Sequence, residues 1–243
     1  MRIQAAAFVG VLVASVGGAA SDARACGFFN YHEARPVPRK AAPVPVANAA
    51  PKPAPVPTSE RIAAADQRLD EERLSLAAAQ VVAAFPAIKT MDVAKEPLET
   101  RAHCILALAL VRSGGSLAGV EGLSYVREAD RAANLEWAVS TLRQVEAARH
   151  DDPVAQANLG EALAARGSYE EEAVRILGGL ANRDLMGSAH GYAALARLRA
   201  SRGEALASDD ATKRCESMTK SPEAVCHPRP ASASIDARLA IRG

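Results

Sequence analysis

The feature that most constrains this chain is a pair of equally spaced landmarks in residues 158–206. Leu159-Gly160 is followed seven residues later by Gly167, and Leu195-Ala196 is followed seven residues later by Gly203. The two later glycines are 203 − 167 = 36 residues apart, close to the period at which helix-turn-helix units stack on one another. The spacing therefore predicts paired helices, each pair burying its apolar face against the next.

Composition favours the same fold class. Hydrophobic residues make up 49% of the 243 residues but aromatics only 4%, and much of the apolar fraction is alanine, which is the best helix former. We therefore predict an all-α fold. The formal net charge is +1 with the charges interspersed. Because nucleic-acid binding usually needs a clustered basic face, no nucleic-acid partner is expected.

The repeated residues resemble a tetratricopeptide repeat, with a good match over residues 154–203 and a loose one over 101–217. In that family the small residue after leucine lets the paired helices touch, and the later glycine makes the turn. The resemblance implies a short right-handed solenoid of helical hairpins. The residues that define the repeat are Leu159, Gly160, Gly167, Tyr169, Ala173, Leu195, Ala196 and Gly203.

The match also has departures. Residues 170–172 carry one residue more than the usual spacing before Ala173, and Ala205 stands where the first copy has Tyr169. A weaker earlier copy containing Gly114 lies 167 − 114 = 53 residues before Gly167, which is not a clean repeat.

The resemblance implies a protein-binding scaffold whose groove is formed by the first helix of each pair. The expected groove residues are Asn158, Glu161, Ala165, His190, Arg197 and Ser201. The basic and asparagine residues that some members use to clamp a carboxylate are not reproduced. The alternative for Glu161 and Arg197 is an ordinary solvated helix face.

The N-terminus has the pattern of an export signal. Arg2 precedes an apolar run, and Ala23-Arg24-Ala25 fits signal-peptidase cleavage, which predicts a signal peptide over residues 1–25. Cys26 then becomes the first mature residue, so acylation and a lipid anchor are an alternative to a soluble periplasmic or secreted protein. An uncleaved membrane anchor is a third alternative.

Residues 26–58 are expected to form an N-terminal tip and a disordered proline-rich linker. Proline fixes φ and removes backbone donors, so residues 36–57 are predicted to be an extended spacer. A helical domain is predicted over residues 59–226, followed by a tail over 227–243.

Three helical stretches are expected before the repeat. One runs from Thr58-Ser59, which could cap it, to Phe85, with an apolar stripe at Ile62, Leu69 and Leu76. Another begins at Pro97 and ends at Gly114-Gly115. The third spans residues 123–150, and Asp151-Asp152-Pro153 starts the next helix. The residues expected to face inward in the third stretch are Val126, Ala129, Ala133, Trp137, Leu142 and Val145.

Cys215 and Cys226 lie eleven residues apart, and in an exported chain this spacing predicts a local disulfide. A zinc site with His227 is the alternative, although paired C-x-x-C spacing is missing. Cys104, inside an apolar helix, is predicted to be a buried free thiol.

No catalytic motif accompanies these features. The chain has no G-x-S-x-G, P-loop or H-E-x-x-H sequence, and its five histidines do not pair at metal-ligand spacing. We therefore expect no cofactor and no metal, and a non-catalytic scaffold that binds a protein or peptide in a bacterial-type cell envelope. A lipid-anchored structural protein and an enzyme of unrecognised class are the alternatives, and membrane contact is expected only through an N-terminal anchor.

Overall fold

The computed structural model of the protein describes residues 56–93, 96–124, 127–149 and 151–227. The predicted signal peptide, Cys26, nearly all of the proline-rich linker, Val126 and the tail beyond His227 lie outside the described residues. Within the described part the regular structure is entirely helical, so the all-α prediction is confirmed.

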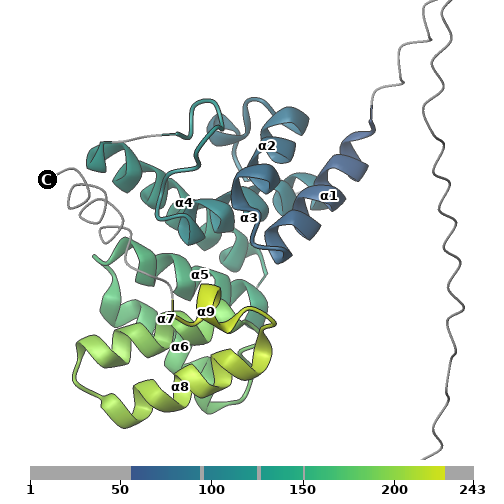
Figure 1. Cartoon of the computed structure of the whole chain (residues 1–243). Coiled ribbons are helices and arrows are strands. Elements are labelled where there is room, and N and C mark those ends of the chain that lie inside the picture. The colour runs from purple at the N-terminus through teal and green to yellow at the C-terminus, as the bar shows by residue number, and fades with distance from the viewer. Residues whose placement is uncertain (1–55, 94–95, 125–126, 150, 228–243) are drawn as a thin grey trace, which may run out of the picture. The chain divides into compact units, whose positions relative to one another are not determined.

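The helices follow one another in chain order with mostly short connections (Figure 1). Their bounds are α1 Thr58–Asp70, α2 Leu74–Ala84, the 3₁₀ turn η1 Ile88–Thr90, α3 Pro97–Arg112, α4 Glu128–Ala148, α5 Pro153–Arg166, α6 Glu170–Asn182, α7 Ala189–Ser201, α8 Ala205–Met218 and α9 Pro222–Val225.

Neighbouring helices form hairpins: α1 packs on α2, α3 on α4, α5 on α6 and α7 on α8. The first helices of the hairpins also contact one another in series, α1 with α3, α3 with α5, and α5 with α7. This layer of odd-numbered helices provides each hairpin with a neighbour for its apolar face, as a helical repeat requires.

The single helix expected between Thr58 and Phe85 is in fact two helices. α1 ends at Asp70, and Glu72 adopts φ +57°, the left-handed conformation that terminates many helices. The Arg73 amide donates to the Arg68 carbonyl at 2.8 Å, which closes the helix end. The chain turns back there, so Leu76 is 53% exposed and was wrongly placed on the apolar stripe.

The start of α1 differs from its prediction in one detail. The helix begins at Thr58, but the capping position is Pro57 and no side-chain cap forms. The expected apolar residues Ile62 and Leu69 are buried.

α3 matches its prediction, with Pro97 in its first turn and a largely buried surface. The chain leaves it through Gly114 and Gly115, which have φ +68° and +86°. A Cβ atom on Gly115 would lie 2.4 Å from the Arg131 carbonyl oxygen of α4. Residues 113–127 then form a long connection to α4, and this connection is why the first interval is 53 residues rather than 36.

α4 begins at Glu128, later than expected, and its buried stripe is rotated from the predicted one. Ala129 and Ala133 are exposed, whereas Leu142 and Val145 are buried as predicted. A polar residue, Asn134, is buried instead. Its side-chain amide nitrogen donates to the Gly115 carbonyl at 2.8 Å. This hydrogen bond compensates for the free-energy cost of burying a polar side chain.

Trp137 of α4 is half-buried and packs against the core. Its Nε1 donates to the Lys89 carbonyl at 3.1 Å, and its ring stacks on His103 with centroids 6.4 Å apart. Burial lowers the pKa of the Lys89 ammonium, which donates to Asn134 at 2.5 Å.

The α5–α6 hairpin shows why small residues recur in the repeat. Asp152 caps α5 by accepting from the Val154 amide at 2.9 Å. A Cβ atom on Gly160 would lie 2.6 Å from Leu177 Cδ2 of α6, and Ala173 of α6 is fully buried. The two helices are therefore in close contact at Gly160, as the sequence pattern predicts.

Tyr169, at the start of α6, packs against the core and also contacts the preceding hairpin. Its hydroxyl donates to Glu136 of α4 at 3.0 Å, and Arg143 of α4 lies 5.1 Å from its ring centroid. Tyr169 therefore connects this hairpin to the preceding one.

The predicted disulfide is present between Cys215 of α8 and Cys226, with Cα atoms 5.9 Å apart. Because both sulfurs are in this bond, the zinc alternative is not supported, and His227 instead lies 2.8 Å from Glu216. Cys104 is a free, half-buried thiol, and burial raises its pKa. A disulfide fits an oxidising, exported compartment.

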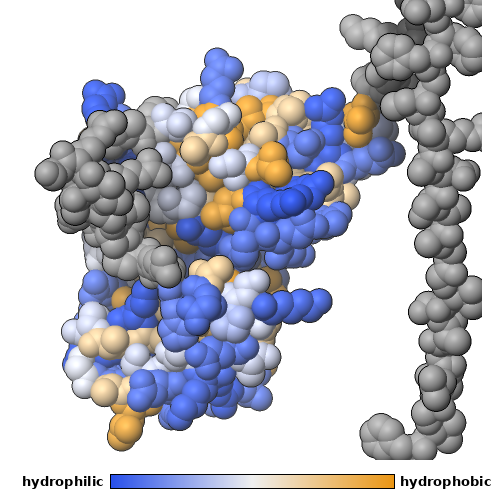
Figure 2. Space-filling model, viewed as in Figure 1, coloured by the Kyte–Doolittle hydropathy of each residue, from blue (hydrophilic) through white to orange (hydrophobic). Residues whose placement is uncertain are grey.

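Exposed apolar residues are scattered over the described surface. On the face shown in Figure 2, the region of α8 and α9 is mainly hydrophilic, with separate apolar residues among the polar ones. None of the helices in the described ranges combines the length and the apolar character needed to cross a bilayer.

Candidate functional site

The odd-numbered helices enclose a small cavity of about 100 Å³ that is rich in charged side chains. Its walls are formed by residues that follow α1 and by residues of α3, α5, α7 and α9. The residues lining it are Glu72, Val111, Arg112, Glu161, Ala165, His190, Ala193, Arg197, Ala224 and Val225.

A second, larger cavity of about 370 Å³ adjoins the first, because Glu72, Arg112, His190 and Val225 line both. We call the two together the central groove. The other residues of the second cavity are Asp66, Leu69, Asp70, Leu108, Val154, Asn158, Gly187, Ser188, Ala189, Met218 and Thr219.

A buried ion pair lies at the centre of the groove. Arg112 Nε of α3 donates to Glu161 Oε1 of α5 at 3.1 Å, and the two side chains are only 11% and 5% exposed. Glu161 Oε2 is buried without a hydrogen-bond partner. One oxygen of this carboxylate therefore lacks a donor among the described residues.

A second acid–base contact adjoins the first. Glu72 Oε1 lies 2.7 Å from His190 Nε2 and 3.9 Å from Arg112. Burial by itself would raise the pKa of Glu72, but the hydrogen bond from His190 and the charges of His190 and Arg112 outweigh it and lower that pKa. Glu72 is therefore an anion at neutral pH.

Arg197 of α7 has no hydrogen bond or salt bridge to any other described residue. It is exposed as a whole residue, but the groove desolvates it and lowers the pKa of its guanidinium, while the charge of Glu161 raises it. An arginine remains charged in proteins, so the groove contains a cation without a close partner.

The disulfide supplies one wall of the groove. Cys226 is bonded to Cys215, which keeps α9 against α7 and α8, and Figure 1 shows α9 lying across α7. Val225 is buried and lines both cavities. The Cys215–Cys226 disulfide therefore helps to form the groove, because it holds α9 in place.

Four of the six residues expected in the groove meet in the first cavity: Glu161, Ala165, His190 and Arg197. Asn158 lines the second cavity. Ser201 lines neither cavity, and its hydroxyl donates to the Leu198 carbonyl of its own helix at 2.8 Å. The solvated-face alternative does not describe Glu161, which is 4% exposed.

Glu72 and Arg112 line the groove, although the sequence pattern does not place them there. Arg112 ends the apolar run of α3, so its position after a buried helix could have suggested it. Glu72 follows an unrecognised helix end, and its contact with His190 spans 118 residues. No local pattern indicates that contact.

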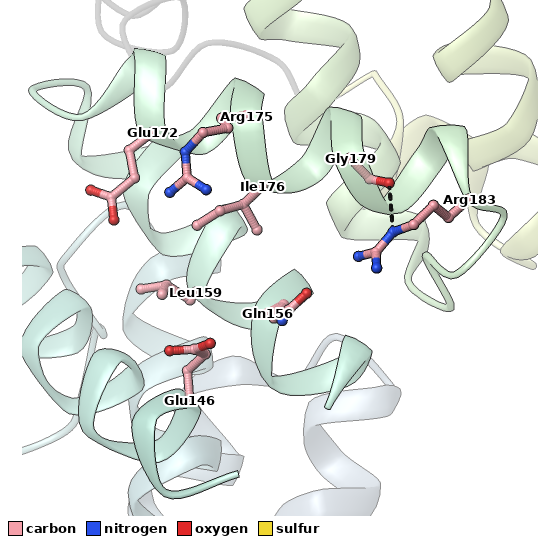
Figure 3. Close-up of a pocket in the computed structure, with 8 residues that line it drawn as sticks. All are labelled: Glu146, Gln156, Leu159, Glu172, Arg175, Ile176, Gly179 and Arg183. Atoms are coloured by element: carbon pink, nitrogen blue, oxygen red, sulfur yellow. Dashed lines mark hydrogen bonds between the residues drawn. The ribbon is translucent and has the colours of Figure 1, made fainter. Parts of the chain in front are cut away.

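A separate pocket of about 320 Å³ lies between α4, α5 and α6 (Figure 3). Arg175 and Glu172 of α6 are on one side of it and Glu146 of α4 is on the other, while Arg183 bonds the Gly179 carbonyl at 3.2 Å. Gln156 and Leu159 line it from α5, on the side of that helix away from Glu161. It provides a reference surface against which the groove can be tested.

Comparisons with known proteins identify no relative. No family matches the chain, and neither the curated proteins nor the solved structures include a match.

Proposed function

We propose that this protein is a non-catalytic scaffold that binds a protein or peptide segment in the central groove of a tetratricopeptide-like helical domain. The observation that carries the proposal is a buried carboxylate oxygen of the groove, Glu161 Oε2, which has no hydrogen-bond donor among the described residues. Buried polar atoms normally have partners. A bound segment would supply a donor for Glu161 and an acceptor for the exposed guanidinium of Arg197, which lines the same cavity.

The surroundings of these groups suit a peptide. Val154 and Met218 are 61% and 43% exposed at the second cavity, so apolar side chains of a partner have surface to cover. A mixture of apolar contacts and a few placed polar groups is typical of recognition sites.

The cell envelope is the proposed location. The Cys215–Cys226 disulfide supports it, because such bonds persist in oxidising compartments. The export pattern of residues 1–25 and the spacer that follows it support it from sequence alone.

The test is a selection of random heptapeptides displayed on phage against the whole chain and two truncation variants. Arg197→Ala lies in the groove, and Arg175→Ala in the pocket of Figure 3 is its matched control. We expect the wild type and Arg175→Ala to enrich the same peptides and Arg197→Ala to lose them, because it lacks the guanidinium that would donate to the segment. Thermal unfolding should change little in both variants, since neither arginine has a hydrogen bond or ion pair to another described residue.

Two outcomes contradict the proposal. Enrichment no greater than on an uncoated surface would exclude peptide binding. Loss in Arg175→Ala with retention in Arg197→Ala would move the site to the α4–α6 pocket.

The rival is a structural protein held at the membrane through an acylated Cys26. Mass spectrometry of the mature N-terminus separates the two, because an acyl chain on Cys26 adds a mass that a soluble protein lacks. An unmodified Cys26 removes the anchor.

A further inference from the structure

The second cavity of the groove has an acidic end, formed where α1 finishes. Asp66, Asp70 and Glu72 line it. Asp66 is paired with Arg101 and Glu72 with His190. Asp70 is exposed and makes no hydrogen bond or ion pair to any other described residue, so its carboxylate is available to a ligand.

The pairing of the groove charges singles out Asp70. Asp66 is paired with Arg101, Glu72 with His190 and Arg112, and Glu161 with Arg112. Arg197 lines only the first cavity, whereas Asp70 lines only the second. Asp70 is therefore the groove carboxylate that no cation of the described residues pairs.

An independent observation also calls for a donor. Glu161, 4% exposed, has its Oε2 buried in the groove without a partner. A ligand that enters the groove must supply an N–H group to this oxygen or leave it unsatisfied, which costs free energy. Any peptide backbone can supply this donor, but only a basic side chain also supplies a cation for Asp70.

Apolar surface lies beside the acidic end. Leu69, Val154, Met218 and Val225 line the same cavity, and Val154 and Met218 are among the most exposed large apolar residues described. A long basic side chain fits this arrangement, because its methylene stem can cover apolar surface while the charged head reaches a carboxylate.

Resting on the proposed function, we infer that the partner segment is basic. A lysine or arginine side chain of the segment lies along Val154 and Met218 and pairs with Asp70, and a backbone N–H of the same segment donates to Glu161 Oε2. The groove thus selects a positively charged peptide over an acidic or a purely apolar one.

The test uses fluorescein-labelled heptapeptide pools with a fixed central residue and Ala, Val, Ser or Leu elsewhere. The centre is lysine, glutamate, or norleucine, which has the lysine stem without the charge. Binding to the whole chain is measured by fluorescence anisotropy. We expect the lysine pool to bind about 1.5- to fivefold more tightly than the norleucine pool, the range for one exposed ion pair.

The preference should disappear in Asp70→Asn and persist in Asp209→Asn, an exposed carboxylate of α8 outside the groove. Raising sodium chloride from 50 to 500 mM should also abolish it, because salt screens exposed charges. The salt arm needs no variant and is therefore independent of any effect on folding.

Equal or tighter binding of the glutamate or norleucine pool would overturn the inference, as would a lysine preference that survives in Asp70→Asn. If the phage selection yields peptides without a basic preference, this inference fails and the proposed function stands. If the selection yields no peptides and no pool binds, both fail.

Discussion

Arg112 of α3 donates from Nε to Glu161 Oε1 of α5 at 3.1 Å, across 49 residues of chain. Both side chains are nearly excluded from water, at 11% and 5% exposure. Removing one partner of such a pair leaves the other charged and buried, which is more costly than the pair itself is stabilising. The pair therefore holds the groove in one arrangement.

The first prediction concerns this pair. Glu161→Ala should lower the free energy of unfolding by about 3 kcal/mol, the range for breaking a buried ion pair. Urea unfolding followed by the fluorescence of Trp137, the single tryptophan, measures it.

The matched control is Glu172→Ala, which breaks the surface pair with Arg143, where the side chains are 33% and 44% exposed. Its loss should stay under about 1 kcal/mol. Equal losses in the two variants would show that the groove pair is solvated.

The second prediction compares two glycines of the α5–α6 hairpin. Gly160→Ala should destabilise the fold by about 1–2 kcal/mol, because its Cβ would overlap the buried Leu177. Gly178→Ala, where a Cβ meets open space in the α6 interior, should stabilise it by roughly 0.5–1 kcal/mol through helix propensity. Thermal and urea unfolding give both values, and shifts of the same sign would contradict the packing described.

The third prediction concerns the Cys215–Cys226 disulfide. The Cys215→Ser, Cys226→Ser double variant should lose roughly 2–3 kcal/mol, as expected for a short closed loop. Hydrogen exchange should show that the loss of stability is local to α9. The Cys226 amide donates to the Pro222 carbonyl at 2.7 Å, and it should exchange faster in the variant while the α3 amides stay protected.

Cys104→Ser serves as the control for the disulfide double variant, since Cys104 is the free thiol of the described part. It should change stability by less than about 1 kcal/mol, as expected for a substitution away from the staple. Unchanged exchange at Cys226 in the double variant would mean that packing alone holds α9.

The fourth prediction is a pH dependence at Glu72. Its folded pKa lies below the ordinary value of 4.5, so the folded state favours the carboxylate. Its contribution to stability should be complete above pH 4.5 and be lost as the pH falls through the lower folded pKa.

The stability difference between wild type and Glu72→Gln, measured by urea unfolding from pH 7 to pH 3, should therefore shrink on acidification. Glu71→Gln provides a comparison at an exposed carboxylate whose pKa is lowered by Gln67 and Arg68. If the stability difference between wild type and Glu72→Gln instead grows as the pH falls, the folded state does not favour the ionised carboxylate of Glu72, and the pKa shift described for it is wrong.

Local patterns in the sequence were sufficient where neighbouring residues make the structure. The Asp152-Pro153 start, the Gly167 turn and the close contact at Gly160 were predictable, because capping, positive φ and small-residue packing act within one hairpin. The Cys215–Cys226 bond was also predictable, since its residues are eleven apart.

The same patterns failed where tertiary contacts decided the outcome. The seven-residue stripe from Ile62 to Leu76 predicted one helix, but the chain reverses at Glu72. In α4 the periodicity placed alanines inward, whereas the hydrogen bond of Asn134 to the Gly115 carbonyl turned another face to the core.

By itself, then, the sequence determined an all-helical chain with two successive helical hairpins in residues 154–217 and a disulfide near its C-terminal end. The tertiary structure decided which charges share the groove. Glu72 meets His190 across 118 residues and Arg112 meets Glu161 across 49. Such pairs arise only when α1, α3, α5 and α7 stack in one layer, because stacking is driven by apolar burial along the whole solenoid rather than by any local signal.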